Sequence, residues 1–167
     1  MRIEEEIKLD YSDVLFRPKR STLKSRKEVD LSRTYQFKYS NREWTGIPIM
    51  ASNMDGVGEL EVAKSLSKFD ILTALTKQHD LESISAFSEI KEIFNYISLS
   101  CGTSEKSYER LNSIISQHTY IQFICIDVAN GYSENFSKFV SSVRDKYPSK
   151  TIIAGNVVTA DMTQELI

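Results

Sequence analysis

The sequence predicts an α/β fold, an incomplete (β/α) TIM-type barrel of about five β/α units. Five short apolar runs each end in polar residues and give way to a helical pattern, and their starts lie 24 to 30 residues apart. That spacing is the length of one strand, one loop and one crossover helix. The runs are almost continuously apolar, as in parallel strands covered on both faces. They are Ile47–Ala51, Ile71–Leu75, Tyr96–Leu99, Ile121–Ile126 and Thr151–Ala154.

The helices between these runs are predicted from apolar periodicity. In the clearest one, Ser133 to Tyr147, apolar residues recur at positions i, i+3, i+4, i+7 and i+11 from Phe136, with Ser133 as N-cap and Pro148 as stop signal. A second helix is predicted over Ser104–Gln117. The others are a helix capped by Asp80 that continues to Phe94 and, with looser patterns, Glu59–Phe69 and Thr159–Ile167.

We predict two parts, an extended capping segment over residues 1–46 and the β/α units over residues 47–167. The first part is polar and basic with scattered apolar anchors, and we expect it to cover one end of the barrel. Pro48 is expected to open the first strand, where a missing N–H is tolerated.

The length of the chain disagrees with a closed barrel. Eight β/α units usually need about 250 residues, and this chain has 167. Its last predicted helix ends on Leu166-Ile167 with no glycine or basic residue, so we expect a longer polypeptide. A complete doubly wound sheet of five strands is the alternative, but the turn Asp55-Gly-Val-Gly58 lacks the third glycine of a dinucleotide fingerprint.

Composition indicates a soluble globular protein, with 41% hydrophobic and 26% charged residues. The net charge of −2 argues against a general nucleic-acid-binding surface. No apolar run approaches the roughly 18 residues of a membrane span. Residues 1–11 lack the apolar centre of an export signal, so we expect a cytoplasmic protein. Cys101 and Cys125 fall in predicted strands and are expected to be reduced core residues.

Polar residues at the strand ends are the candidate site residues, because chemistry collects at the carboxyl ends of barrel strands. Lys77 can stabilise a phosphate or a developing negative charge, or it can be a surface lysine. Asp127 can bind a ribose hydroxyl or transfer a proton. No metal site is predicted, since His79 and His118 lack companions at ligand spacing. The full set is Asn53, Asp55, Lys77, Thr103, Asp127, Asn130 and Asn156.

A basic cluster lies in the first part of the chain. Residues 17–27 hold six cationic side chains and three hydroxyls. Such a run is either a solvated loop or a phosphate-binding segment, in which arginine offers paired donors.

Five stretches carry a resemblance to a known family. They are KLDYSDVLFRPKRSTLKSR (8–26), ASNMDGVG (51–58), FDILTALTK (69–77), CIDVANGYSENF (125–136) and TIIAGNVVT (151–159). The chain resembles the IMP dehydrogenase/GMP reductase family, and DVANGYSE is similar to its reductase branch. The resemblance implies a (β/α)8 barrel that uses NADPH to convert GMP to IMP with release of ammonia. It covers about the first half of the family's length and implies a homotetramer. From charge and hydropathy, we expect no nucleic-acid or membrane partner.

The resemblance also implies roles for particular residues. It assigns Lys77, Thr103 and Asp127 to hydride transfer and deamination. It places NADPH against Ser25, Arg26, Lys77, Asp127, Val128 and Ala129, and the nucleotide against Ser52, Met54 and Asn156. The family's nucleophilic cysteine and its monovalent-cation (K⁺) site lie beyond Ile167, so this chain alone is expected to be inactive.

The sequence departs from the family pattern at two places. Ser52 and Gly56 stand where the family usually has alanine and threonine, and Thr76-Lys77-Gln78-His79 replaces HKHY. A second hypothesis also stays open. It is a non-catalytic half-barrel, either a decaying remnant or a subunit that associates through its unclosed sheet edges.

Overall fold

The computed structural model describes residues 5, 7, 9–87 and 89–167, and it divides into two units. The first unit is the N-terminal segment (residues 1–30), whose described residues form two short 3₁₀ helices, η1 (Tyr11–Asp13) and η2 (Arg26–Glu28). Asp10 caps the first of these, and its Oδ1 accepts a 2.6 Å hydrogen bond from the backbone N of Tyr11. The second unit, the barrel unit (residues 31–167), contains the strands and α-helices.

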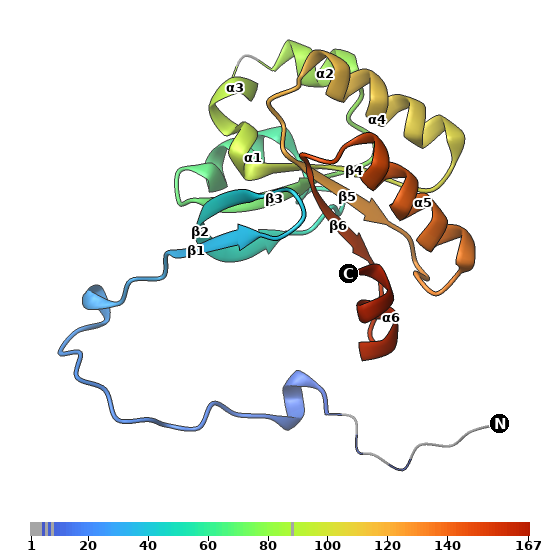
Figure 1. Cartoon of the computed structure of the whole chain (residues 1–167). Helices are drawn as coiled ribbons and strands as arrows, with labels where there is room; N and C mark the ends of the chain where they lie inside the picture. Colours follow the sequence, from blue (N-terminus) through green and yellow to red (C-terminus); the bar gives the residue numbers. More distant parts are fainter. Residues whose placement is uncertain (1–4, 6, 8, 88) are drawn as a thin grey trace. The chain divides into compact units, whose positions relative to one another are not determined.

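The barrel unit is built on one six-stranded sheet with the strands in sequence order (Figure 1). β1 (Arg33–Phe37) pairs antiparallel with β2 (Arg42–Ala51), and all later neighbours pair in parallel. The remaining strands are β3 (Ile71–Leu75), β4 (Ile97–Cys101), β5 (Phe123–Asp127) and β6 (Thr151–Gly155). The five parallel strands, each followed by helix, confirm the predicted partial barrel.

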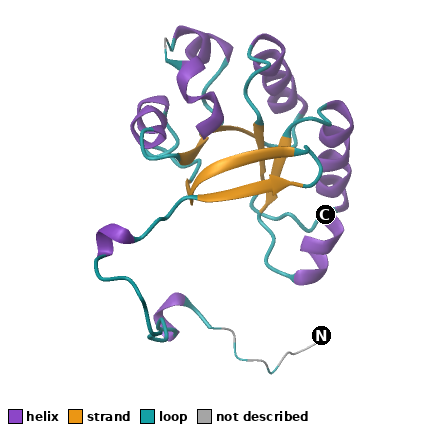
Figure 2. Ribbon diagram, turned by 60° about the vertical axis from the view of Figure 1, so that its left-hand side comes forward, coloured by secondary structure: helices purple, strands orange, loops and turns teal. Residues whose placement is uncertain are grey.

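The helices lie in an arc around the outside of the sheet (Figure 2). They are α1 (Leu60–Ser67), α2 (Leu81–Ala86), α3 (Ile90–Ile93), α4 (Glu105–Gln117), α5 (Glu134–Lys146) and α6 (Ala160–Leu166), with the 3₁₀ turn η3 (Phe94–Tyr96) after α3. Ser133 caps α5, as predicted, and Ser104 caps α4. In the described residues no helix combines the length and apolar character that a bilayer crossing requires.

Alternation along the strands separates an outer face from an inner face. In β4, Ile97, Leu99 and Cys101 belong to the apolar core shared with the helices. Successive strand residues point to opposite faces, so Ser98 and Ser100 face the barrel interior. Cys101 and Cys125 lie in β4 and β5 and are buried, as predicted, and both are free cysteines.

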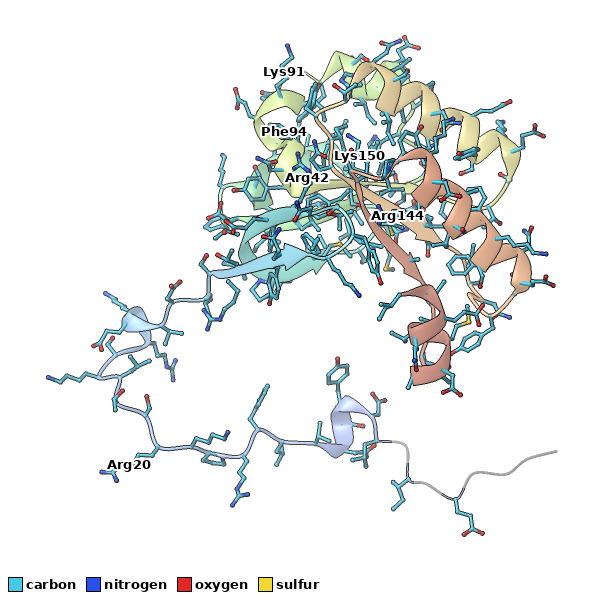
Figure 3. All side chains as sticks on the ribbon, viewed as in Figure 1. Arg20, Arg42, Lys91, Phe94, Arg144 and Lys150 are labelled. Carbon is cyan, nitrogen blue, oxygen red and sulfur yellow. The ribbon has the colours of Figure 1, made fainter. Side chains whose placement is uncertain are left out.

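The β1–β2 hairpin closes the end of the barrel where the parallel strands begin. The rings of Phe37 and Phe123 meet edge to face with centroids 5.7 Å apart, at the first residue of β5. The Ser40 hydroxyl lies 2.8 Å from that of Thr151, the first residue of β6. Trp44 Nε1 donates to the carbonyl of Asn95, just before β4. We call this hairpin-covered end the base; Arg42, Arg144 and Lys150, labelled in Figure 3, lie in the same region.

Two boundaries differ from the sequence prediction. The units divide at residues 30 and 31, whereas the prediction placed the boundary at 46 and 47, because β2 continues through Gly46. Pro48 does not open the first strand and lies within β2. The register with β3 shifts there, between Ile47 and Met50, and such an irregularity tolerates a residue without an N–H.

The predicted helix from Asp80 to Phe94 is wrong as a single element. Asp80 does cap α2, but the helix ends at Ala86 and α3 begins at Ile90. Ile84, Ile90 and Ile93 are all buried. Nine residues of continuous α-helix would turn Ile93 by about 180° from Ile84. The break therefore lets both residues reach the same core.

The bounds of β4 and β5 also differ from the predicted ones at both ends. Tyr96 belongs to η3, and β4 begins at Ile97 and reaches Cys101. β5 begins at Phe123, two residues after the predicted start, and includes Asp127.

Candidate active site

Lys77 and Asp127 meet at the carboxyl ends of the strands. The Lys77 Nζ lies 2.7 Å from Asp127 Oδ2 and donates a 2.7 Å hydrogen bond to the Asp127 carbonyl. Lys77 follows β3 and Asp127 ends β5, and β4 lies between these strands. The ion pair therefore spans the end of β4. The side chains are 42% and 31% exposed, so a ligand can reach both.

A pocket of about 250 Å³ opens beside this pair, and we call it the mouth pocket. Its polar lining comes from the carboxyl ends of three strands and the residues that follow them, namely Ser52, Asn53, Asp127 and Asn156. Met50, Ala74 and Cys125 supply part of the apolar floor. An apolar floor with a few converging polar groups is typical of a small-molecule binding site.

Backbone hydrogen bonds join the loops after β5 and β6. Val128 N donates to the Gly155 carbonyl and Asn156 N donates to the Val128 carbonyl, both at 2.9 Å. Gly131 N donates to the Asn156 carbonyl at 3.0 Å. A Cβ at Gly131 would lie 2.8 Å from that carbonyl oxygen, so this approach requires glycine. Val128 and Asn156, two of the predicted site residues, are thereby held together.

The other predicted residues are less tightly associated. Thr103 is half-buried after β4, and in the described part of the chain no hydrogen bond joins its side chain to Lys77 or Asp127. Met54 is 63% exposed on the loop after β2. Ala129 is exposed beside Val128. Asn130 is occupied locally, since its Oδ1 accepts from Tyr132 N.

Ser25 and Arg26 belong to the N-terminal segment. The Ser25 hydroxyl caps η2 by accepting a hydrogen bond from Lys27 N at 3.2 Å. Arg26 is the first residue of that turn, and its side chain is exposed.

Neither cysteine is an activated nucleophile. Burial raises the pKa of the Cys101 thiol to about 12, and burial also raises the pKa of Cys125. Both thiols therefore stay protonated near neutral pH, whereas the thiolate is the reactive form.

Sequence reasoning missed Arg110 on α4. Its guanidinium donates to the carbonyls of His79 and Ser100. Burial lowers the pKa of Arg110, which shows that its charge is partly withdrawn from water. Its position on the predicted helix could have revealed it. Arg110 lies four residues before the buried Ile114, so both residues are on the same face of α4.

Glu59 and His79 form a second contact that was not predicted. His79 Nε2 lies 3.0 Å from Glu59 Oε2 and 3.3 Å from the Gly58 carbonyl. In the described ranges no three His, Cys, Asp or Glu side chains are grouped to hold a metal ion.

Comparison with known proteins identifies the family. The family model "IMP dehydrogenase / GMP reductase domain" matches residues 8–167. The chain belongs to this family. It is 50% identical to GMP reductase from Citrobacter koseri and 51% identical to GMP reductase from Klebsiella pneumoniae. Each match covers the whole of this chain and 49% of the relative, so the chain spans about half the length of these relatives.

A solved structure supports the same assignment. Inosine 5′-monophosphate dehydrogenase from Legionella pneumophila superposes with a TM-score of 0.73 at 25% sequence identity. The match covers 93% of this chain and 46% of that structure. The likeness supports the partial-barrel fold of this chain.

Proposed function

We propose that this chain supplies the first half of an NADPH-dependent GMP reductase, which converts GMP to IMP and releases ammonia. The observation that carries the proposal is the Lys77–Asp127 contact at the barrel mouth. It joins two polar residues that the reductase resemblance selects, 50 positions apart in the chain. Identity near 50% to named GMP reductases supports the reductase over the dehydrogenase activity.

The residues present fit a purine nucleotide. Ser52, Asn53 and Asn156 bring hydroxyl and amide groups to the mouth pocket, where they can pair with base edges and ribose hydroxyls. Met54, on the same loop as Ser52, is the exposed apolar candidate for contact with the base.

The same end of the barrel fits the cofactor. NADPH, when bound, supplies the hydride that replaces the purine amino group. Asp127, Val128 and Ala129 would lie along it, with Lys77 as a fixed cation and Thr103 as a neutral donor. Ser25 and Arg26 would bind its phosphate end, because arginine and hydroxyl donors match phosphate oxygens.

The isolated chain should not turn over. The proposed chemistry requires a nucleophilic cysteine, and both thiols here are buried with raised pKa values. The nucleophile and a monovalent-cation (K⁺) site would come from the other half of the protein, and we propose a cytoplasmic homotetramer for the complete enzyme.

A fusion tests this function. Residues 1–167 are joined to the remaining half of Citrobacter koseri GMP reductase, and NADPH oxidation is followed with GMP present. We expect ammonia-coupled turnover in the fusion and none in residues 1–167 alone. A folded fusion without turnover would refute the assignment. Activity of the isolated chain that is lost on mutating Cys101 or Cys125 would refute the statement about the nucleophile. In the active fusion, Arg26→Ala should raise the KM for NADPH.

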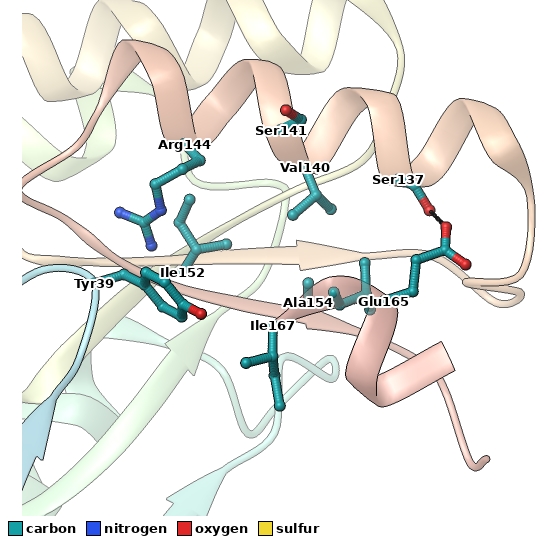
Figure 4. A pocket seen from close by; sticks show the side chains of 10 residues that line it. Tyr39, Ser137, Val140, Ser141, Arg144, Ile152, Ala154, Glu165 and Ile167 are labelled. Atoms are coloured by element: carbon teal, nitrogen blue, oxygen red, sulfur yellow. Dashed lines mark hydrogen bonds between the residues drawn. The ribbon is translucent and has the colours of Figure 1, made fainter. Parts of the chain in front are cut away.

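A second candidate function is a non-catalytic half-barrel that associates through its edge. β6 is the last strand of the sheet. A groove of about 360 Å³ lies beside it, between α5 and α6, lined in part by Val140, Ile152, Ala154 and Ile167 (Figure 4). If this function holds, light scattering should find a dimer or larger species. A monomer at high concentration would exclude it.

A further inference from the structure

Lys77 stands on a short loop, residues 77–80, that links β3 to α2 and that we call the Lys77 loop. The residue before the loop is held in place, because Thr76 N donates a 2.8 Å hydrogen bond to the Gly58 carbonyl. Gln78 Nε2 donates to Asp55 Oδ1 at 3.3 Å. Asp80 closes the loop as the cap of α2, accepting from Ser83 N at 2.9 Å.

Both positions that depart from the family pattern after Lys77 take part in these anchors. Gln78 reaches Asp55, and the His79 ring lies between Glu59 and the Gly58 carbonyl. These contacts all hold the Lys77 loop toward the loop after β2. None of them draws it toward β4, which Lys77 must cross to reach Asp127.

Arg110 supplies the contact in the other direction. One guanidinium nitrogen donates to the His79 carbonyl, in the Lys77 loop, and the other donates to the Ser100 carbonyl, in β4. A planar guanidinium fixes two acceptors relative to each other in a way that a single ammonium does not. The side chain thus ties the Lys77 loop to the strand that separates Lys77 from Asp127.

We propose that Arg110 is a positioning residue, which holds the Lys77 loop against β4 so that the Lys77 ammonium reaches Asp127. The inference rests on the proposed function only for the chemical task of Lys77. The geometric statement concerns this chain by itself.

Arg144 provides a matched control at the base. Its guanidinium also donates to backbone carbonyls, those of Tyr147 at 3.4 Å, Pro148 at 3.2 Å and Lys150 at 2.8 Å. Burial lowers its pKa as well. These carbonyls lie in the connection from α5 to β6, far along the chain from the Lys77 loop. Loss of Arg144 should therefore destabilise the fold without releasing Lys77.

The test is competitive acetylation of the 167-residue chain, with each lysine quantified by mass spectrometry. Acetylation requires a Lys77 Nζ that is free of its oxygen contacts. Asp127→Asn removes the carboxylate charge and keeps the backbone carbonyl, so it gives the rate for Lys77 without its ion pair. We expect Arg110→Met to raise the Lys77 rate severalfold, toward that of Asp127→Asn, and Arg110→Lys to restore part of the protection. Arg144→Met should leave the Lys77 rate unchanged. The exposed Lys138, paired only within its own helix with Glu134, is the internal reference.

The outcomes separate positioning from general loosening. A folded Arg110→Met chain with the wild-type Lys77 rate would overturn the proposal, and so would an equal rise in Arg144→Met. If Arg110→Met does not fold, Arg110→Gln, which retains an amide donor, decides by the same comparison. Acetylation uses no nucleotide, so an inactive wild-type fusion would refute the proposed function and leave this result standing. In an active fusion, Arg110→Met should lower kcat by about ten- to a hundredfold with the KM for GMP unchanged.

Discussion

The two ends of the partial barrel differ in the kinds of side chain that form them. At the base, the hairpin brings aromatic rings and polar side chains against the first residues of the strands, as in the Phe37–Phe123 and Ser40–Thr151 contacts. At the mouth, which is the opposite end of the barrel where the parallel strands finish, the strands are followed by half-exposed polar groups. The Lys77–Asp127 pair is among them. Both ends use a partly buried arginine that binds carbonyls, Arg144 at the base and Arg110 at the mouth.

The base therefore contributes mainly to folding stability, and the mouth is the part available for chemistry. Apolar burial at the base removes surface from water and contributes to folding. A half-exposed ion pair at the mouth contributes little to folding but stays available to a ligand. Substitutions at the base should therefore lower stability, and substitutions at the mouth should alter Lys77 and the activity of the fusion.

Phe123→Ala should have the largest effect on stability. The side chain is only 4% exposed and meets Phe37, so its loss removes buried area and leaves a cavity at the base. We expect the free energy of unfolding to fall by about 3–5 kcal/mol, measured by urea denaturation. Phe69→Ala is the control, because Phe69 is 64% exposed and should change stability by less than about 0.5 kcal/mol. Similar losses in both variants would contradict the role of the base.

Gly58→Ala tests whether close backbone packing beside Lys77 holds that residue in place. A Cβ at Gly58 would lie 2.5 Å from the Ala74 carbonyl oxygen and 3.0 Å from Thr76 N, which precedes Lys77. We expect a loss of about 1–3 kcal/mol and faster acetylation of Lys77. Gly56→Ala is the matched control: its φ of +74° makes alanine unfavourable by about 1 kcal/mol, but nothing lies within 4 Å. Lys77 should keep its wild-type rate there, and an equal rise would contradict the prediction.

His118 makes stability depend on pH. Its Nε2 lies 2.9 Å from the Ser85 hydroxyl and its Nδ1 lies 2.6 Å from the Tyr120 hydroxyl. Burial, with a smaller contribution from Lys91, lowers the pKa of His118 below 6.5. The unfolded chain then binds the proton at higher pH than the folded chain, so stability falls as pH drops below about 6.5. The slope from this residue is at most about 1.4 kcal/mol per pH unit. In His118→Gln, the denaturation midpoint should change less between pH 7 and pH 5 than it does in the wild-type chain. An equal change in both chains would refute the assignment to His118.

Asp127→Asn should have the smallest effect on stability and a large effect on chemistry. The Lys77 and Asp127 side chains are 42% and 31% exposed, so their pairing contributes about 0–1 kcal/mol to folding. In the fusion, loss of the carboxylate should lower kcat by about a hundredfold or more, measured by NADPH oxidation. A stability loss as large as that of Phe123→Ala would show that the mouth and the base do not differ as described.

The sequence determined the order of elements and the identity of the residues at the strand ends. Apolar runs at regular spacing predicted the parallel strands, and helical periodicity located α4 and α5, with Ser133 as the predicted cap of α5. These features depend on neighbouring residues in the chain, because hydrophobic period and capping are local. Convergence of the strand ends also followed, since parallel strands end at the same edge.

Only the tertiary structure decided which side chains meet. The Lys77–Asp127 contact spans β4, and Arg110 joins His79 to Ser100, because sheet order and side-chain reach set these partners. The break between α2 and α3 and the hairpin at the base were likewise decided by packing against a shared core. A periodic pattern encodes which face a residue occupies. Its partner on that face is set by hydrogen bonds between segments that are distant in the chain.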